Sequence, residues 1–327
     1  MKNKSLLLVL AIVSGSSFCL KSAHAQNLTV SNFQSIDVPG ASQTLAYAIA
    51  GNTEVGQYTQ NGVTYGFAET GSSITTLNHA TDRTPANTYL RGVYVDPNTG
   101  NTTLLGGYYS KDGLSHGFSQ TGGVYTAIND PKGVSTYVFG KSGETVVGYY
   151  NLANGNSIGF SMTGGTYSDI IDPNAGTHTY LRSISGNTIV GDYTDKNNVS
   201  HAFSETAGLF TDINLPPGVQ SSSARGISGN IVAGFYTDLN GITQGFLEMG
   251  TTFTPVIDPA GGLGSKTYVT GISGNEIVGY YTTAAGVSHS FTADIAVAPG
   301  APAPPVTACL AFAGVLLLQA LRNRKTA

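Results

Sequence analysis

The stretch HTYLRSISGNTIVGDYTDKNNVSHAF, residues 178–203, determines how this chain folds. Within it, Gly186-Asn187 separates two apolar runs, and a Gly-Asn pair in this setting is typical of a two-residue β-hairpin, whose turn needs positive φ. The DKNN segment at 195–198 marks a second turn, and a third run ends at Phe203. Tight turns make successive strands antiparallel neighbours, so the stretch predicts three strands of a β-meander.

This stretch is one copy of a repeat that fills most of the chain. Ser-Gly-Asn turns recur at 228–230 and 273–275, and Pro-Gly corners such as 130–133 and Gly-Gly pairs such as 164–165 supply further turns. Each copy holds a phenylalanine, and successive phenylalanines are 42–51 residues apart. The phenylalanines are Phe67, Phe118, Phe160, Phe203, Phe246 and Phe291, and the Gly-x-Tyr motifs upstream of them are at 56–58, 107–109, 148–150, 191–193, 234–236 and 279–281.

The repeat length predicts the architecture. Four turns in about 43 residues leave about 11 residues for each strand with its turn, which fits strands of about 5–6 residues and short connections. One four-stranded meander cannot bury both of its faces, whereas copies stacked around an axis can. Six copies therefore predict an all-β fold, a six-bladed β-propeller of four-stranded antiparallel blades over residues 26–295. Residues 28–36 match the last strand of other copies, and the sequence leaves open whether they complete the final blade and latch the ring.

The composition excludes some classes of protein. Hydrophobic residues make up 40% of the 327 residues and charged residues 10%, a balance that argues against disorder. Without the two end segments described next, the chain has 9 Lys or Arg against 19 Asp or Glu, a net charge of −10. Such a surface repels phosphate backbones, so no nucleic-acid partner is predicted.

The first 25 residues predict a signal peptide. Lys2 and Lys4 form a basic start, residues 6–13 are apolar, and the AHA segment at 23–25 places small residues where a signal peptidase cuts. We expect cleavage after Ala25 and export through the inner membrane. The predicted location is the cell surface, the outer envelope or the extracellular space.

The C-terminus has three parts: a Pro/Ala-rich linker at 296–305, an apolar run at 306–321 and a basic end at 322–327. We expect 306–327 to form a hydrophobic sorting or anchor helix that engages the membrane with its basic end in the cytoplasm. The order of these parts resembles the PEP-CTERM sorting signal, and the resemblance implies exosortase-type machinery as a partner. The expected glutamate is absent, since residues 302–304 read Pro-Ala-Pro, and a simple C-terminal anchor is the alternative.

Both cysteines, Cys19 and Cys309, lie in these end segments. The domain between them therefore cannot use disulfides, thiol nucleophiles or Cys-ligated metals. The sequence has no His-Glu-x-x-His, no phosphate loop and no dinucleotide fingerprint. No catalytic residue, metal site or cofactor is predicted.

Three segments with the pattern Ser-His-x-Phe, at 115–118, 200–203 and 288–291, follow Gly-x-Tyr hairpins. In these motifs the chain resembles the HAF repeat family over about residues 30–293. The resemblance implies an exported, extracellular repeat protein and implies no particular activity.

One column of the repeat offers a binding site. Arg91, Arg182 and Arg225 hold the same position in three copies, where the other copies have an aromatic residue or threonine. If this column lines one mouth of the ring, the three guanidinium groups could hold a carboxylate or an acidic sugar. The alternative is three solvated strand positions.

The second copy breaks the symmetry of the repeat. It carries about eight extra residues around 78–87, including His79, Asp82 and Arg83, and a longer hairpin at 96–101. Insertions in repeat proteins map to loops, often on the binding face, so these three side chains are a second predicted ligand contact. A loop expansion without function is the alternative.

Two further columns are interpreted as structural. His116, His201 and His289 share a column that holds Tyr, Ile and Gln in the other copies, which argues against a metal site. The Asp and Asn residues near the Pro corners, such as Asn129 and Asp172, are interpreted as caps of turns.

The leading hypothesis is therefore a non-enzymatic binding or interaction scaffold at the cell surface or in the extracellular matrix, with a glycan, a polymer or a protein as ligand. The alternative is a hydrolase or lyase that acts on extracellular polysaccharide on a propeller scaffold. Two close carboxylates at one mouth, from non-equivalent repeat positions, would favour the enzyme.

Overall fold

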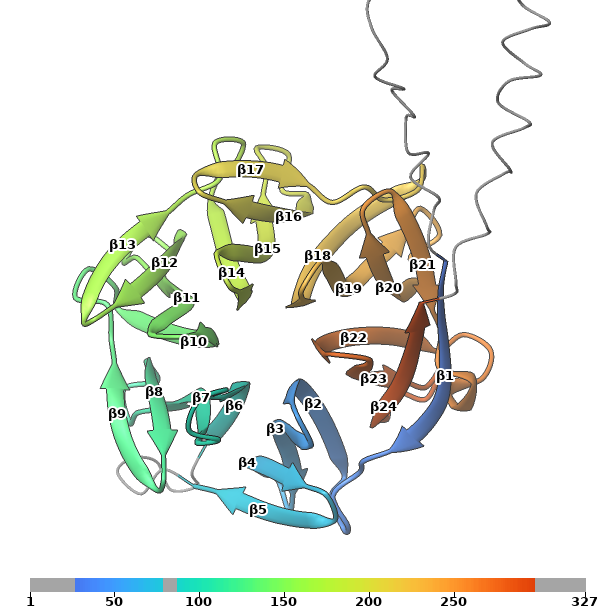
Figure 1. The fold of residues 1–327 in the computed structure, drawn as a ribbon, viewed down its shortest axis with the longest axis horizontal. Coiled ribbons are helices and arrows are strands. Elements are labelled where there is room, and N and C mark those ends of the chain that lie inside the picture. Colours follow the sequence, from blue (N-terminus) through green and yellow to red (C-terminus); the bar gives the residue numbers. More distant parts are fainter. Residues whose placement is uncertain (1–26, 79–86, 298–327) are drawn as a thin grey trace, which may run out of the picture. The chain divides into compact units, whose positions relative to one another are not determined.

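The structure is a computed structural model that describes residues 27–78 and 87–297. These residues form 24 β-strands and one short 3-10 helix, η1 (Pro259–Gly261). Four sheets have four strands each, and a fifth has eight because one parallel bridge, Ser157 to His178, joins two four-stranded halves. The strands therefore form six antiparallel meanders, which surround a common axis (Figure 1). This arrangement confirms the prediction of an all-β propeller with four-stranded antiparallel blades.

Each blade runs from an inner strand at the axis to an outer strand (Figure 1). Blade 1 is β2 (Gln43–Ala50), β3 (Thr53–Gln60), β4 (Val63–Thr70) and β5 (Ser73–Leu77); blade 2 is β6 (Thr88–Val95), β7 (Thr102–Tyr109), β8 (Ser115–Thr121) and β9 (Val124–Ile128). Blade 3 is β10 (Ser135–Ser142), β11 (Thr145–Asn151), β12 (Ser157–Thr163) and β13 (Thr166–Ile170); blade 4 is β14 (His178–Ser185), β15 (Thr188–Thr194), β16 (Ser200–Thr206) and β17 (Leu209–Asp212). Blade 5 is β18 (Val219–Ser228), β19 (Ile231–Asp238), β20 (Thr243–Met249) and β21 (Thr252–Val256); blade 6 is β22 (Lys266–Ser273), β23 (Glu276–Thr282), β24 (Ser288–Val297) and β1 (Leu28–Ser35).

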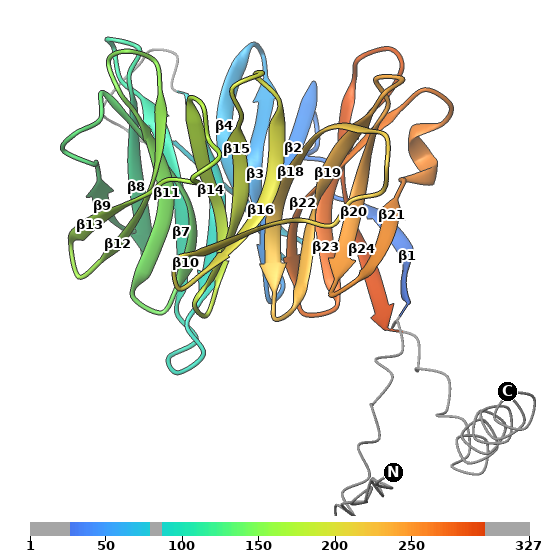
Figure 2. The ribbon, with the colours of Figure 1, turned by 90° about the horizontal axis from the view of Figure 1, so that it is seen from above.

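The propeller has two faces, seen from the side in Figure 2. On the hairpin face, short turns join the inner strand of each blade to the second strand. On the loop face, a longer segment joins the outer strand of one blade to the inner strand of the next. The β6–β7 hairpin, residues 96–101, projects from the hairpin face (Figure 2).

The ring is latched by its first strand, which decides the blade phase that the sequence left open. β1 pairs with β24 in antiparallel register, so the final blade takes three strands from the end of the repeat region and one from its start. Asp37 extends this latch, because its carboxylate accepts from the Ser290 amide at 2.9 Å and lies 2.7 Å from Nδ1 of His289. The latch replaces two free sheet edges with a paired blade.

The phenylalanine column forms the centre of each blade-to-blade core. All six of these side chains are at most 1% exposed, and burying one stabilises the fold by about 1.5–3 kcal/mol. A glycine on the second strand lies opposite each Phe. At Gly148, for example, a Cβ would lie 2.1 Å from the carbonyl oxygen of Tyr137 and 3.0 Å from the Phe160 ring, so a side chain has no space.

The Gly-x-Tyr alignment was wrong in one copy. In blade 2 the glycine opposite Phe118 is Gly106, and the structural motif is 106–108 rather than 107–109. The sequence Gly106-Gly107-Tyr108-Tyr109 permits both alignments, and only the pairing with β8 selects one. Gly107 therefore holds the position that an aromatic ring holds in blade 3.

The predicted signal peptide (1–25), most of the linker (296–305) and the anchor helix (306–327) lie outside the described residues, as do both cysteines. β24 continues to Val297, so the last blade extends two residues into the predicted linker. In the part of the chain that the structure describes, no helix is long and apolar enough to cross a membrane.

Candidate functional site

Every inner strand contains a β-bulge at the same place. The pairing between inner and second strands skips one residue in each blade, and a bulge of this kind re-aims the side chain of the skipped residue. These six residues, here called the bulge ring, all line one cavity of about 220 Å³ on the axis. The bulge ring is Tyr47, Arg91, Phe139, Arg182, Arg225 and Thr270.

A small residue follows each member of the bulge ring, because the inner strands approach closely there. A Cβ on Gly92 would lie 1.7 Å from the carbonyl oxygen of Phe139, and one on Gly271 would lie 2.9 Å from Cα of Ala48. The six small residues are Ala48, Gly92, Gly140, Ser183, Gly226 and Gly271.

The structure brings the three predicted arginines together. Arg91, Arg182 and Arg225 line the 220 Å³ cavity, and they also line a second cavity of about 150 Å³ with Phe235 and Tyr280. They are thus channel residues rather than solvated strand positions. The other predicted contacts, His79, Asp82 and Arg83, lie outside the described residues.

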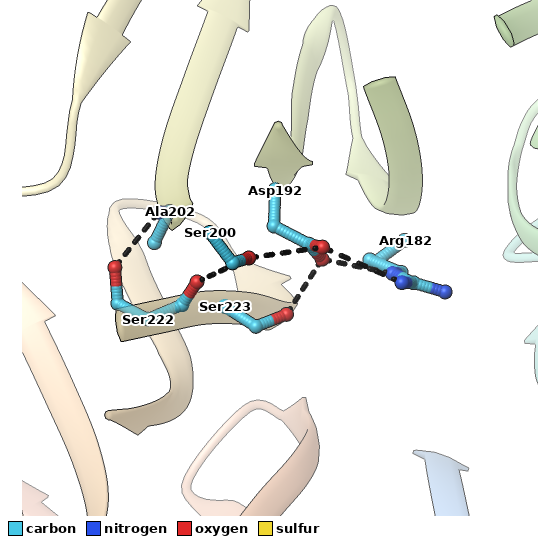
Figure 3. Close-up of polar contacts among 6 residues, drawn as sticks. All are labelled: Arg182, Asp192, Ser200, Ala202, Ser222 and Ser223. Carbon is cyan, nitrogen blue, oxygen red and sulfur yellow. Dashed lines mark hydrogen bonds and ion pairs between the residues drawn. The ribbon is translucent and has the colours of Figure 1, made fainter. Parts of the chain in front are cut away.

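Arg182 is held in an ion pair. Its Nε lies 3.0 Å from Oδ1 of Asp192, and the two side chains are only 10% and 6% exposed (Figure 3). Ser223 donates to the same carboxylate at 2.6 Å, and Ser200, which donates to the Ser222 carbonyl at 3.1 Å, lies 3.5 Å from it. Burial works to raise the pKa of Asp192, but the guanidinium groups of Arg182 and Arg225 and these hydrogen bonds hold that pKa below its usual value. The positive charge of Arg182 is therefore already paired with a carboxylate of the protein, that of Asp192.

Arg91 and Arg225 lie over aromatic rings, as Arg182 also does, but neither forms an ion pair with a carboxylate of the described residues. The guanidinium carbon of Arg91 lies 3.9 Å from the ring centroid of Tyr47, and that of Arg225 lies 5.0 Å from the ring of Phe235. Nε of Arg225 is buried without a hydrogen-bond partner, and among the described residues no carboxylate forms an ion pair with Arg225. Burial, reinforced by the charge of Arg182, lowers the pKa of Arg225 to about 10. Arg225 is therefore a buried cation without a carboxylate in direct contact among the described residues, and the charge of Asp192, which is paired with Arg182, acts on it from farther away.

Pairs of aromatic rings lie nearer the loop face than the bulge ring, in blades 3, 4 and 6. Tyr149 lies 4.7 Å, between ring centroids, from both Tyr137 and Tyr180, and the Tyr268 and Tyr280 rings are also 4.7 Å apart. We call Tyr137, Tyr149, Tyr180 and Tyr268 the aromatic plug. These four residues line neither cavity, whereas the 220 Å³ cavity is lined by residues next to the hairpins, such as 48–50 and 271–273. The cavity therefore opens toward the hairpin face.

The cavity is positive within an acidic protein. The described residues include 8 Lys or Arg and 18 Asp or Glu. The three arginines and Lys141 line the 220 Å³ cavity, and Asp192, just behind its lining, is bound to Arg182. Half of the described cations therefore meet at the axis with one carboxylate.

The rim of the cavity is asymmetric at blades 2 and 3. Nζ of Lys141 lies 5.3 Å from the ring centroid of Tyr94, and both residues line the cavity. The six-residue hairpin 96–101 stands beside them, where the other blades have two-residue turns. Asp96 caps its own hairpin by accepting from the amides of Asn98 and Thr99, and these bonds lower its pKa. The hairpin thus keeps its shape without a ligand.

The two columns interpreted as structural have local partners. His116, His201 and His289 stack on tyrosine rings of the same blade at 5.1–5.4 Å. Among the described residues, no group of His, Cys, Asp and Glu could hold a metal ion. The turn-capping column mixed two neighbouring positions, because Asp172 and Asp258 match Asp130, the residue after Asn129. Each of these three carboxylates accepts from the amide two residues ahead, as a turn cap does.

Two segments, 113–117 and 155–159, match Gly-x-Ser-x-Gly, the pattern of a hydrolase nucleophile. Their serines, Ser115 and Ser157, begin β8 and β12 and are 1% and 3% exposed. Ser115 donates to the carbonyl of Thr136, and no strand-to-helix turn is present at either place. The match therefore reflects the repeat and not a nucleophile.

Sequence reasoning missed Asp192, Ser223 and the aromatic plug. Asp192 is the middle residue of a Gly-x-Tyr motif, and it is the one acidic residue at that position in the six copies. A search for the copy that departs from the column would have identified it, once strand alternation had placed this position on the face opposite the motif's tyrosine.

No protein-family model matches the chain, and no curated protein matches it significantly. Among solved structures, the putative TolB from Agrobacterium tumefaciens is 13% identical with a TM-score of 0.52, and the match covers 84% of this chain and 99% of that chain. A fungal lectin from Aleuria aurantia, described as a six-bladed β-propeller with a novel fucose recognition mode, is 11% identical with a TM-score of 0.47 over 83% and 99%. Similarity at these levels of identity shows the fold alone.

Proposed function

We propose that this protein is an exported, non-enzymatic binding scaffold of the cell surface or extracellular matrix, and that its axial cavity binds an acidic group of a glycan, polymer or protein. The observation that carries the proposal is the charge of the cavity. Arg91, Arg182, Arg225 and Lys141 line it, and one carboxylate accompanies them, in a domain that is otherwise acidic. Arginine in a water-poor cavity is well suited to hold a carboxylate, through two parallel charge-assisted hydrogen bonds.

The proposed location of the protein is inferred from its N-terminal and C-terminal segments. The predicted signal peptide supports export, and the apolar segment with its basic end supports membrane engagement before processing by exosortase-type machinery. The resemblance of the Ser-His-x-Phe motifs to the HAF repeat family agrees with a six-bladed, extracellular repeat protein. Secretion of the chain with loss of its last 20 or so residues, measured by mass spectrometry of the surface fraction, would support this address; retention of the whole chain in the cytoplasm would contradict it.

The alternative, a polysaccharide hydrolase or lyase, needs two carboxylates or an equivalent acid and base near one another. No Asp or Glu is among the described residues that line the cavity, and Asp192, which lies behind its lining, is already bound by Arg182 and Ser223. This arrangement favours binding over cleavage.

A panel of acidic and neutral glycans, incubated with the full-length chain and assayed for both binding and cleavage, tests the proposal. We expect binding to the acidic members without new chain ends. Release of reducing ends or unsaturated products would favour the enzyme, and absence of binding to every acidic member would overturn the proposal. A deletion mutant with unchanged surface matrix would count against the proposed role in the envelope.

A further inference from the structure

Resting on the proposed function, we infer that the cavity recognises the end of an acidic glycan. One terminal sugar unit that carries a carboxylate enters from the hairpin face, and its carboxylate binds Arg225. The neighbouring unit lies outside the cavity, over Lys141 and Tyr94.

The shape of the channel supports binding of an end rather than of an internal segment. The cavity opens toward the hairpin face, and the rings of the aromatic plug lie nearer the loop face, in blades 3, 4 and 6. Its two parts measure about 220 and 150 Å³, so neither part alone reaches the roughly 300 Å³ at the lower end of sites that enclose a drug-sized ligand. We expect each part to admit one terminal unit rather than an internal segment of a polymer.

The surroundings of the three arginines select Arg225 as the anion-binding residue. Asp192 neutralises Arg182, and Arg91 is sandwiched by Tyr47 and Tyr89, with its guanidinium carbon 3.9 and 5.2 Å from the two ring centroids. Arg225 lines both cavities, and its Nε is buried without a partner. A bound carboxylate would supply the missing acceptor, because a buried donor left unsatisfied is costly.

The chemistry of the walls selects a sugar that carries the carboxylate. Tyr47, Phe235 and Tyr280 line the 150 Å³ cavity around Arg225 and present flat apolar faces together with two phenol groups. The C–H face of a pyranose ring packs on such faces, while its hydroxyl groups bond to phenols. A uronic acid combines this ring with one carboxylate.

The asymmetric rim supplies the second contact. Lys141 and Tyr94 line the same cavity at its mouth, beside the projecting hairpin 96–101. A lysine and an aromatic face suit the carboxylate and the ring of the next uronate unit.

Calorimetric titration of the full-length chain in a mild detergent with galacturonate monomer, dimer, trimer and hexamer tests this inference. We expect one protein molecule per oligomer at every length, because each oligomer has one end that fits. Galacturonamide keeps the ring and loses the charge. Its affinity should be lower than that of galacturonate by a factor of about ten or more. Several protein molecules per hexamer, or equal binding of galacturonamide, would overturn the inference.

Variants of the same chain locate the subsite. Arg225→Gln should weaken monomer binding about tenfold, and Arg225→Lys should retain part of it, whereas Lys196→Gln on the loop face should have no effect. Lys141→Gln should weaken dimer binding more than monomer binding. A native melting temperature shows that each variant is folded, and a folded Arg225→Gln chain with wild-type affinity would refute the assignment.

The outcomes separate this inference from the proposed function. If no galacturonate binds while another acidic member of the panel does, the inference fails and the proposed function stands. If no acidic ligand binds, both fail.

Discussion

Blades 4 and 5 present the same residue at the same bulge, in two different environments. Arg182 of blade 4 lies 3.0 Å from the carboxylate of Asp192, whereas Arg225 of blade 5 lies over the ring of Phe235. Asp192 and Phe235 hold equivalent places, since each follows the glycine that pairs with the inner strand. The repeat thus delivers a cation to the axis, and one residue on the adjacent strand decides whether that cation is structural or available to a ligand.

The largest effect is expected when the structural cation loses its partner. Asp192→Asn leaves Arg182 buried without a counter-ion, so the free energy of unfolding should fall by about 3–5 kcal/mol in urea denaturation. The matched variant in blade 5, Phe235→Leu, removes no charge partner and should cost about 1 kcal/mol. Equal losses in the two variants would remove the distinction between the blades.

The comparison of buried charges with and without a charged partner extends to a carboxylate, that of Glu54, between blades 1 and 6. Glu54 is 8% exposed, and burial, with the charges of Glu276 and Glu69, raises its pKa to about 7. Because this folded-state pKa lies above the ordinary value of 4.5, the folded protein binds the proton more tightly, and stability should fall between pH 4.5 and 7 and remain level above it. We expect Glu54→Gln to be about 1–2 kcal/mol more stable than wild type at pH 8, and similar to it at pH 4.5.

Urea unfolding at several pH values measures this effect. Glu144→Gln, at an exposed hairpin position, serves as the control and should leave the pH profile unchanged. A wild-type profile that rises from pH 4.5 to 7 would contradict the account of Glu54.

Exchanging the environments of the two arginines sharpens the comparison further. Phe235→Asp gives Arg225 the partner that Arg182 has, so the affinity for galacturonate should fall about tenfold, a loss of about 1.4 kcal/mol. Phe235→Asn, which removes the ring without adding a charge, is the control and should lose less. Titration of both variants decides between loss of the ring and neutralisation of the arginine.

The smallest effect concerns the stability cost of the unpaired cation. Replacing Arg225 by methionine removes a buried charge that has no carboxylate in direct contact, and the free energy of unfolding should rise by about 1 kcal/mol, net of the lost contact with Phe235. Arg182→Met should destabilise the chain instead, since it leaves the buried carboxylate of Asp192 without its ion-pair partner. A destabilised Arg225→Met chain would give Arg225 the same structural role as Arg182.

The sequence contained much of the fold because tight turns act locally. Gly186-Asn187 fixes a hairpin within a few residues, and repetition of such turns predicts four-stranded meanders. The prediction from sequence was wrong where two local alignments were equally good. Whether Gly106 or Gly107 lies opposite Phe118, and whether Asn129 or Asp130 matches Asp172, is decided only when the neighbouring strand selects a register.

The candidate site was visible only in part. The column of Arg91, Arg182 and Arg225 could be found by aligning copies, but its position at the axis depends on a bulge that no turn motif announces. Asp192 was hidden in the middle of a Gly-x-Tyr motif, where its contact with Arg182 depends on the pairing of two strands.

The amino-acid sequence by itself determined the repeat, the strands and the number of copies, because hairpin turns and alternating strands are specified by neighbours along the chain. The tertiary structure decided that β1 closes the last blade, that the bulges aim six side chains at one axis, and that Asp192 forms its ion pair with Arg182 and not with Arg225. These outcomes depend on contacts between residues far apart in the chain, where packing and charge balance act together.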